Sequence, residues 1–549
     1  MRTGGQLIVE ALEANGVERI FCVPGESYLA VLDALHDSKI KTIVCRQEGG
    51  AAMMADCEGR LTGKPGICFV TRGPGATNAS AGIHIAMQDS IPMLLFIGQI
   101  AGHAREREAF QEVNYKRFFG DIAKWVVEID RAERIPELVT RAFAVATSGR
   151  PGPVVISLPE DMLTSEAEAP MALPATPVET RPGDAELDKL EELLRTARRP
   201  FAILGGTRWG QDGVADMRTI AEKWALPVGV SFRRQMLFDN LHPNYAGDIG
   251  IGPSPQLAKA VKEADLVLLI GGRFGEMPSS DYTLLKSPYP DQTLVHVHAD
   301  ANELGRVYRP TLAINASPAA FVEAFAKRSG PKKPGWAAET ERLHKAYLDW
   351  STPPETGPGA VQVGPIMNYL EGVLPDDAVI CNGAGNFATW MHRFHRYRRI
   401  NTQAAATSGS MGYGLPAGVA AKALFPEREI IVWAGDGDFL MHGQEFATAV
   451  QYGLPIVVVI LNNGIYGTIR MHQEREYPGR VSGTTLRNPD FAAYARAFGG
   501  HGETVEKTAD FAPAFERARA SGKAAIIEVK LDPEAITPTR TLTDIREKA

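Results

Sequence analysis

Two short polar motifs in the last third of the chain have the residue types and the spacing of a site for a metal ion and a phosphate group. Gly435-Asp436-Gly437 follows the apolar run 430–434, and Asn462-Asn463 follows the apolar run 454–461. These runs are typical of parallel strands, and a helix is predicted between them over 443–451. Because open α/β sheets bind ligands at the carboxyl ends of neighbouring strands, we expect the acid and the amides to meet at one edge.

The residue types suit a divalent cation that carries a phosphate. Mg²⁺ prefers oxygen ligands, usually one or two protein side chains together with phosphate oxygens. Asp436 would supply a charged oxygen, Asn463 a neutral one and the backbone carbonyl of Ile465 a third. The glycines would let a diphosphate approach the backbone and accept its N–H groups. GDG alone is common in turns, but GDG and NN after successive strands strongly indicate a magnesium–diphosphate site.

The rest of the chain alternates short apolar runs with amphipathic stretches, which predicts parallel sheets covered by helices on both faces. Proline-rich segments at 166–183 and 351–359 are expected to be linkers. The predicted fold class is therefore α/β, with three doubly wound parallel-sheet domains over 1–165, 184–350 and 360–549. The expected strands include 66–71, 93–99, 201–204, 266–270, 456–461 and 525–529.

Length and composition exclude several other classes of protein. The chain has 549 residues, 44% of them hydrophobic and 22% charged, which is ordinary for a globular protein. A net charge of −7 argues against a nucleic-acid partner, and no apolar run approaches the roughly 18–20 residues that span a membrane. The five cysteines contain no CxxC pair, and with no signal peptide at the start we expect reduced thiols and a cytoplasmic location.

The GDG and NN motifs resemble the fingerprint of enzymes that depend on thiamine diphosphate (ThDP). The resemblance covers nearly the whole chain and falls in the acetolactate synthase-like branch of the 2-oxo acid decarboxylase superfamily. It implies a pyrimidine-binding, a central and a diphosphate-binding domain. Other stretches that carry it are Pro24-Gly25, Arg46–Ala51, Gly73–Asn78, Asp89–Pro92, Ala109–Val113 and Gly409–Pro416.

The resemblance assigns roles to individual residues. Glu48 matches the glutamate that hydrogen-bonds the pyrimidine of the cofactor, and Met411 matches the apolar residue that holds the cofactor in a bent shape. In this family the glutamate meets the cofactor of the other subunit, which implies a homodimer with shared active sites, with a homotetramer as a further option. The remaining expected cofactor-binding residues are Pro24, Gly25, Gly385, Asn386, Phe387, Ser410, Gly435, Asp436, Gly437, Asp438, Asn463, Ile465, Tyr466 and Gly467.

Four further residues are candidates for the substrate side of the site. Phe110 and Gln111 match pocket residues of acetolactate synthases, with plain packing as the alternative. His84 and Gln88 lie one helical turn apart, and a histidine near the cofactor could transfer protons. The alternative for His84 is a structural role.

Three residues depart from the acetolactate synthase pattern and leave the substrate open. Gly49 stands where glutamine usually follows the activating glutamate, and His472 falls where biosynthetic enzymes have a tryptophan. Arg72 replaces a small residue, and could pair with a substrate carboxylate or form a structural ion pair.

The function predicted is ThDP- and Mg²⁺-dependent decarboxylation of a 2-oxo acid such as pyruvate, followed by carboligation. The alternatives are a decarboxylase that does not ligate, a 2-hydroxyacyl-CoA lyase, and a cofactor-binding protein without catalysis. Glycine turns at 205–207 and 271–274 could hold FAD, a CoA-type nucleotide or nothing. The basic run 392–399 is expected to be a solvated or subunit-contact face, with nucleic acid as the weaker alternative.

Overall fold

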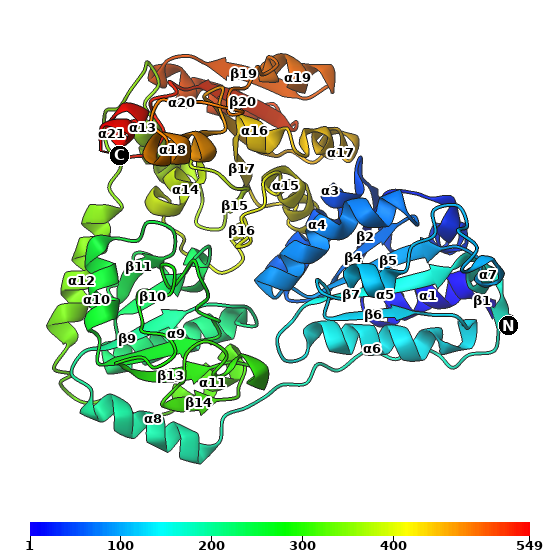
Figure 1. Ribbon diagram of the computed structural model, residues 1–549, viewed down its shortest axis with the longest axis horizontal. Coiled ribbons are helices and arrows are strands. Elements are labelled where there is room, and N and C mark those ends of the chain that lie inside the picture. Colours follow the sequence, from blue (N-terminus) through cyan, green and yellow to red (C-terminus); the bar gives the residue numbers. More distant parts are fainter. Residues whose placement is uncertain (549) are drawn as a thin grey trace.

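The computed structural model describes residues 1–548 and contains three six-stranded sheets in which all strands are parallel (Figure 1). Helices cover each sheet, so that every sheet forms the centre of an α/β domain. The predicted fold class is confirmed. We call the domains first, central and third, in chain order.

The first domain is built on the sheet β3-β2-β4-β5-β7-β6. A short antiparallel pair, β1 with β8, ties the start of the chain to the end of this domain. The strands are β1 (Arg2–Thr3), β2 (Arg19–Cys22), β3 (Lys41–Val44), β4 (Gly66–Val70), β5 (Met93–Gln99), β6 (Trp125–Glu128), β7 (Pro153–Pro159) and β8 (Glu166–Ala167). The helices are α1 (Gly4–Ala14), α2 (Leu29–His36), α3 (Glu48–Thr62), α4 (Pro74–Asp89), α5 (Tyr115–Phe119), α6 (Ile135–Thr147) and α7 (Glu160–Thr164).

The central domain is built on the sheet β11-β10-β9-β12-β13-β14. Its strands are β9 (Pro200–Leu204), β10 (Val228–Ser231), β11 (Tyr245–Ile249), β12 (Leu266–Ile270), β13 (Thr293–Val297) and β14 (Leu312–Ile314). Its helices are α8 (Asp184–Thr196), α9 (Gly210–Trp224), α10 (Pro255–Glu263), α11 (Pro318–Phe325) and α12 (Ala337–Trp350).

The third domain is built on the sheet β16-β15-β17-β18-β20-β19. Its strands are β15 (Val379–Asn382), β16 (Gln403–Ala405), β17 (Ile430–Gly435), β18 (Val457–Asn462), β19 (His501–Val505) and β20 (Ala525–Lys530). Its helices are α13 (Val363–Val373), α14 (Ala388–Phe394), α15 (Gly414–Leu424), α16 (Asp436–Phe439), α17 (Phe446–Gln451), α18 (Gly467–Glu476), α19 (Phe491–Ala497), α20 (Thr508–Ala520) and α21 (Leu542–Glu547). The helix predicted over 443–451 is a 3₁₀ turn, Gly443–Glu445, followed by α17.

The first and third domains have the same strand order. When the strands of each sheet are numbered along the chain, both sheets read 2-1-3-4-6-5, whereas the central sheet reads 3-2-1-4-5-6. In both orders the direction of winding reverses inside the sheet, and ligands bind at that point, beyond the carboxyl ends of the strands. In the third domain the reversal lies between β15 and β17, next to the GDG motif.

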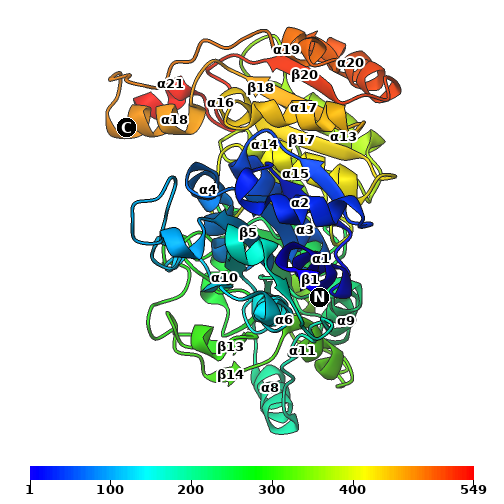
Figure 2. The same cartoon turned by 90° about the vertical axis from the view of Figure 1, so that its right-hand side faces the viewer.

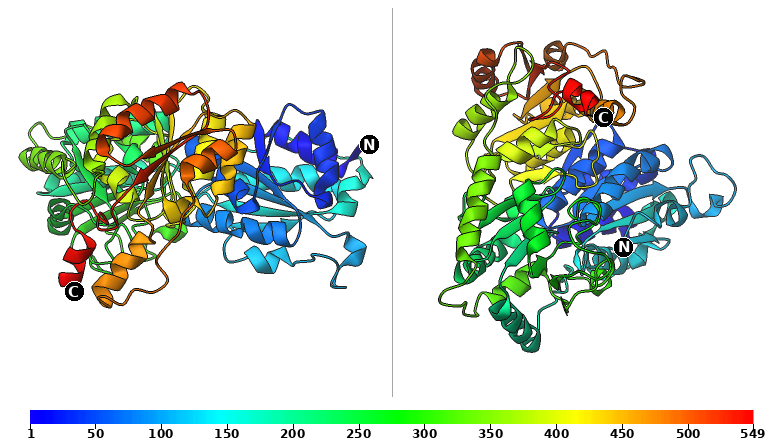
Figure 3. Two further views of the ribbon diagram at one scale, coloured as in Figure 1. Left: turned by 90° about the horizontal axis from the view of Figure 1, so that it is seen from above. Right: turned by 60° about the vertical axis from the view of Figure 1, so that its left-hand side comes forward.

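The first and third domains share one apolar core. Helices α3 and α15 pack against each other, and Figures 2 and 3 show the first and third domains side by side. The buried cluster around these helices takes residues from both sheets. The Cys57 thiol in α3 donates to the Ala417 carbonyl in α15 at 3.3 Å. The central domain has two core clusters of its own, which are made only of its own residues.

The five cysteines are free and buried, in agreement with the prediction of reduced thiols. Among the described residues, no helix combines the length and the apolar character needed to cross a membrane.

Candidate active site

The GDG and NN motifs meet at the carboxyl edge of the third sheet. Strands β17 and β18 are parallel neighbours with Gly435 opposite Leu461, so the residues that follow them emerge side by side. Asp436 is the first residue of α16, and Asn463 comes directly after Asn462, which ends β18. The acid and the amides therefore lie close together, as their positions after two successive strands of the sequence predicted.

The Asp436 carboxylate is buried and held by neutral donors. Its Oδ2 accepts hydrogen bonds from the Gly464 N–H at 2.9 Å and from Asn488 Nδ2 at 2.6 Å, and the same Asn488 amide donates to Asn462 Oδ1 at 2.9 Å. Burial raises the pKa of Asp436 above its usual value, and hydrogen bonds from Gly437 and Asn488 oppose that rise. The sequence analysis missed Asn488, which lies in a loop far downstream without a motif of its own.

This environment fits a divalent cation. Within residues 1–548, Asp436 takes part in none of the ion pairs, so no basic side chain compensates its buried charge. The same residues contain no group of three or more His, Cys, Asp or Glu that could hold a metal. A cation here would therefore depend on one carboxylate together with neutral oxygens, which is the donor set that Mg²⁺ accepts beside phosphate. Asn463 Oδ1 accepts a hydrogen bond from the Ile465 N–H at 3.3 Å, which keeps these two residues close to each other.

The two glycines of the GDG motif are explained by aromatic rings of the protein itself. A Cβ on Gly435 would lie 2.7 Å from the Phe387 ring, and a Cβ on Gly437 would lie 2.6 Å from the Tyr466 ring. The space next to these glycines is thus filled by side chains. Packing therefore requires glycine at both positions, in addition to any close approach of a phosphate. Gly464 has a φ of 67°, the left-handed region that favours glycine.

Two loops complete this edge. In the loop after β15, Asn386 accepts from the Thr468 hydroxyl at 3.0 Å and donates from Nδ2 to the Ile536 carbonyl at 3.2 Å. The loop 406–412 contains Ser410 and Met411, both partly buried. We call the residues at this edge the third-domain group: Gly385, Asn386, Phe387, Ser410, Met411, Gly435, Asp436, Gly437, Asp438, Asn463, Ile465, Tyr466 and Gly467.

Asp438 faces these loops. Its Oδ1 accepts from the Ala384 N–H at 3.0 Å and from the Gly412 N–H at 2.9 Å. Burial raises the pKa of Asp438 to about 7, although the two N–H groups lower it. Asp438 thus joins the two loops, and these two hydrogen bonds explain why an aspartate lies here.

The candidates of the first domain gather around the turn between β4 and α4. A Cβ on Gly75 in the first turn of α4 would lie 3.3 Å from Glu48 Oε1, and Glu48 Oε2 accepts from Asn78 Nδ2 at 3.0 Å. Glu48 begins α3, where the Gln47 side chain caps the helix by accepting from the Gly50 N–H at 3.1 Å. We call these residues the first-domain group: Pro24, Gly25, Glu48, Phe110 and Gln111.

Gly25, Phe110 and Gln111 touch the same turn. A Cβ on Gly25 would lie 2.4 Å from the Thr71 Cβ, and one on Gly73 would lie 2.7 Å from the Gln111 Cβ. Phe110 is 73% exposed, which is unusual for a large apolar side chain.

Within the described part of one chain, the two groups are not joined by hydrogen bonds. Among the described residues no hydrogen bond joins a member of the first-domain group to a member of the third-domain group. His84 and Gln88 are both exposed on α4 and belong to neither group. Gln88 uses its backbone carbonyl to accept from Arg273 of the central domain.

The three departures from the family pattern have local explanations. Arg72 donates to Glu160 at 3.0 Å, to Glu26 at 3.3 Å and to the Phe110 carbonyl at 3.3 Å, so the structure favours the structural ion pair over a free substrate-binding cation. A side chain on Gly49 would meet the Gln47 side chain first, because a Cβ there lies 2.7 Å from Gln47 Oε1 and 3.1 Å from His442 Nε2.

His472 lies on α18 and lines the interdomain cavity. Its Nδ1 accepts from Arg475 Nη2 at 2.8 Å, which keeps the imidazole next to a positive charge. The position predicted to differ from biosynthetic enzymes is therefore polar in this protein.

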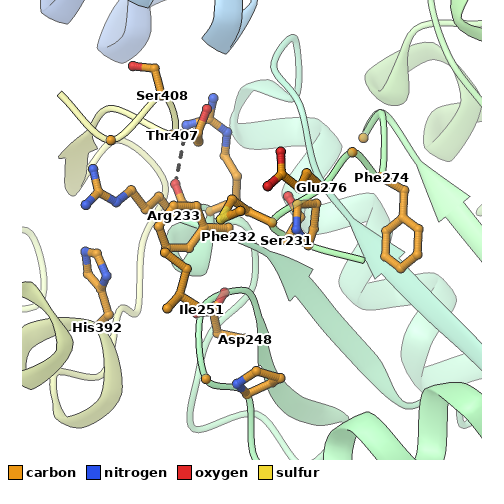
Figure 4. A pocket seen from close by; sticks show the side chains of 18 of the residues that line it. Ser231, Phe232, Arg233, Asp248, Ile251, Phe274, Glu276, His392, Thr407 and Ser408 are labelled. Carbon is orange, nitrogen blue, oxygen red and sulfur yellow. Dashed lines mark hydrogen bonds between the residues drawn. The ribbon is translucent and has the colours of Figure 1, made fainter. Parts of the chain in front are cut away.

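A cavity of about 1250 Å³ lies between the three domains (Figure 4). Both central-domain glycine turns contribute Gly206, Gly271 and Gly272 to its wall, together with basic side chains such as Arg150 and Arg306. Its volume and positive charge fit an anionic nucleotide group.

The basic run 392–399 differs from its prediction as a solvated or subunit-contact face. Arg393 stacks on the Trp350 ring, with 3.5 Å from its guanidinium carbon to the ring centroid, and Arg398 pairs with Asp239 at 3.2 Å. His392 lines the cavity. Arg393 and Arg398 are thus occupied in contacts between the third and central domains, which argues against the nucleic-acid alternative.

Three domains of one enzyme family match this chain. The sequence profiles described as thiamine pyrophosphate enzyme N-terminal TPP binding, central and C-terminal TPP binding domains match residues 2–118, 187–325 and 383–529. The acetolactate synthase large subunit of Parasynechococcus marenigrum is 33% identical over 92% of this chain and 83% of its own length. The isozyme 2 large subunit of Escherichia coli is 30% identical, with 96% and 95% covered, and the mitochondrial catalytic subunit of Saccharomyces cerevisiae is 28% identical, with 96% and 81% covered.

Proposed function

Because the chain belongs to the thiamine pyrophosphate enzymes, we propose that it decarboxylates a 2-oxo acid such as pyruvate with ThDP and Mg²⁺. The unit that remains after loss of carbon dioxide would be joined to a second carbonyl compound. The acetolactate synthase names of the relatives support this reaction.

The edge shared by β17 and β18 is the observation that carries the proposal. Asp436, Asn463 and the Ile465 carbonyl would hold Mg²⁺, and the loops with Asn386 and Met411 would hold the diphosphate and thiazolium parts of the cofactor. When bound, ThDP supplies an electron sink for the bond that breaks as carbon dioxide leaves. The buried, uncompensated charge of Asp436 supports a cation at this place.

The role proposed for Glu48 is to hold a proton at the pyrimidine ring. Its Oε2 is oriented by the Asn78 amide, which leaves Oε1 as the atom available for a ligand. Glu48 begins α3, and capping of that helix by Gln47 keeps the carboxyl group in place.

We also propose a homodimer in which the first-domain group of one chain completes the third-domain group of another. The lack of hydrogen bonds between the two groups in the described part of one chain supports this arrangement, as does the exposure of Phe110. A tetramer built from two such dimers is the further option.

Three reactions are compatible with the same site: carboligation, simple decarboxylation and 2-hydroxyacyl-CoA cleavage. The polar His472 position and Gly49 leave simple decarboxylation and 2-hydroxyacyl-CoA cleavage as alternatives to carboligation. FAD or another nucleotide in the interdomain cavity would be an addition, and no part of the proposed reaction depends on it.

The domain limits 1–165, 184–350 and 360–549 and a cytoplasmic location belong to the same proposal. The irregular segments between β8 and α8 and between α12 and α13 support the limits. The five buried free thiols support a reducing compartment.

The test is release of carbon dioxide from a panel of 2-oxo acids with ThDP and Mg²⁺, with the products identified by NMR. Acetolactate from pyruvate would support the proposal, and an aldehyde would favour the decarboxylase. Glu48→Gln should lose most turnover while the fold is kept. No release from any acid by a protein that binds ThDP would refute the 2-oxo acid assignment and favour acyl-CoA substrates.

A further inference from the structure

Arg233 crosses from the central domain into the third domain and binds two backbone carbonyls there. It lies in the turn after β10, and its Nη2 donates to the Gly383 carbonyl at 2.9 Å while Nη1 donates to the Ala406 carbonyl. Only 4% of the residue is exposed. Figure 4 shows the side chain extending toward the side of the cavity where His392 and Ser408 lie.

The first of these contacts is on a peptide that Asp438 also holds. The Gly383 carbonyl and the Ala384 N–H belong to the same peptide unit, which leads into the proposed diphosphate loop 385–387. Arg233 binds the carbonyl, and Asp438 Oδ1 accepts from the N–H at 3.0 Å. Both polar ends of this peptide are therefore fixed by side chains, one from each domain.

The second contact repeats this arrangement on the loop 406–412. Arg233 binds the carbonyl at its first residue, Ala406, and Asp438 accepts from the N–H of its last residue, Gly412, at 2.9 Å. Met411, the residue expected to shape the cofactor, lies inside the segment that these two contacts bracket. One arginine and one aspartate thus determine where both cofactor loops begin or end.

The backbone of Arg233 is in an unfavourable conformation. Its φ is 57°, in the left-handed region that residues other than glycine rarely adopt. The guanidinium lies 5.0 Å from the centroid of the Phe232 ring, and although burial lowers its pKa to about 10, it remains charged at neutral pH. Such a conformation persists where surrounding contacts require it, and the contacts here are those to the two loops.

We propose that Arg233 is a positioning residue for the ThDP site, which fixes the loops 383–387 and 406–412 from outside the domain that contains them. The inference rests on the proposed function and deepens it. Arg233 would act through the two backbone carbonyls that it binds. The central domain would then contribute to cofactor binding whether or not its own cavity holds a ligand.

The test compares Arg233→Met and Arg233→Lys with Arg19→Met as a matched control. Arg19 is also buried, at 8% exposed, and pairs with Glu58 at 2.9 Å, but it lies in the first domain away from both loops. Two quantities are measured: the Kd for ThDP with Mg²⁺ from tryptophan fluorescence, and hydrogen exchange of both loops in the cofactor-free protein. Trp433 is a suitable reporter, because its Nε1 donates to the Phe387 carbonyl at 2.9 Å.

We expect Arg233→Met to raise the Kd on the order of tenfold or more, since two buried carbonyls lose their donors, and to speed exchange in both loops. Arg233→Lys should have a smaller effect, because an ammonium group lacks the fork that reaches two carbonyls. Arg19→Met should change neither quantity.

Unchanged affinity and exchange in Arg233→Met, with a wild type that binds ThDP, would overturn the positioning role and leave the proposed function intact. A wild type that binds no ThDP would overturn the proposed function, and loop exchange would then decide the positioning role alone. If Arg233→Met does not fold, Arg233→Lys decides: wild-type affinity overturns the inference, and weakened affinity with faster loop exchange supports it.

Discussion

Replacing Asp89 by alanine is expected to destabilise the protein by about 3–5 kcal/mol, because a buried ion pair would lose one partner. Asp89 ends α4 in the first domain and is 4% exposed. Its Oδ2 lies 2.6 Å from Arg60 Nη2, and its backbone carbonyl accepts from Arg234 of the central domain at 3.3 Å. The carboxylate therefore balances positive charge at the junction of the domains.

The magnitude follows from the groups that would be left without partners. Asp89 accepts from the Thr407 N–H at 2.8 Å, the Thr407 hydroxyl at 2.5 Å and the Ser408 N–H at 3.2 Å. Each buried donor left unpaired costs about 1–3 kcal/mol. Asp56, at 2.9 Å from Arg60 Nη2, limits the loss because it stays next to the guanidinium. Asp89→Asn keeps part of the hydrogen bonding, so we expect it to cost about half as much.

The effect should depend on pH. Burial alone would raise the pKa of Asp89, but the charges of Arg60 and Arg234 and the Thr407 hydrogen bonds outweigh it, and the pKa in the folded protein lies below the usual value. A lowered carboxyl pKa contributes stability above the unfolded value of about 3.9, and this contribution is lost as the pH falls through the folded pKa. The difference between wild type and Asp89→Ala should thus be full at pH 7 and shrink below about pH 4.

Urea unfolding followed by tryptophan fluorescence is the assay. Glu137→Ala is the control, because its ion pair with Arg134 is fully exposed and its loss should leave the unfolding midpoint unchanged. A destabilisation below about 1 kcal/mol in Asp89→Ala at pH 7 would contradict the stabilising role assigned to the buried Asp89 carboxylate, since it would place this variant among ordinary surface substitutions.

Three further outcomes are expected. Asp436→Asn should abolish the Mg²⁺-dependent part of ThDP affinity, measured by fluorescence titration with and without a chelator; retention of that dependence would contradict the metal role. Gly437→Ala should cost about 1–3 kcal/mol in urea unfolding, because its new methyl group meets an aromatic ring at 2.6 Å. Its control, Gly372→Ala in α13, has open space around the new methyl group and should be neutral or stabilising. Arg546→Ala should release α21 from α18 and speed proteolysis of the last turn, because Arg546 binds both oxygens of Glu474 at 2.8 and 3.0 Å. The hydrogen bonds from Arg546 lower the pKa of Glu474 to about 2. As the pH falls from the usual glutamate pKa to about 2, the stabilisation of α21 in the wild type should therefore be lost progressively.

The fold and the meeting of Asp436 with Asn462 and Asn463 at one sheet edge were predictable because both follow from local sequence patterns. Continuous apolar runs identify the parallel strands, and the motifs that follow β17 and β18 must meet wherever those strands are neighbours. The position of Asp436 next to Asn462 and Asn463 required nothing beyond this.

Residues that act across domains were not predictable in the same way. Asn488 binds Asp436 from 52 residues further along the chain, and Arg233 reaches the loop at Ala406 from 173 residues away. No periodicity or spacing relates such partners, because the contact depends on how whole domains pack. Gly435 was expected to make room for a diphosphate. In the structure the space next to Gly435 is filled by the ring of Phe387, a residue that follows a different strand.

The core shared by the first and third domains also affects how the protein folds and how it can evolve. These two domains have the same strand order and bury their apolar helices against each other, so neither can unfold without exposing the core of its neighbour. They should behave as one cooperative unit, like two halves of an internal duplication. The central domain keeps two cores of its own and contributes Met236 to a buried cluster of the third domain, so it is the part of the chain in which new ligands can be accommodated while the other two domains stay unchanged.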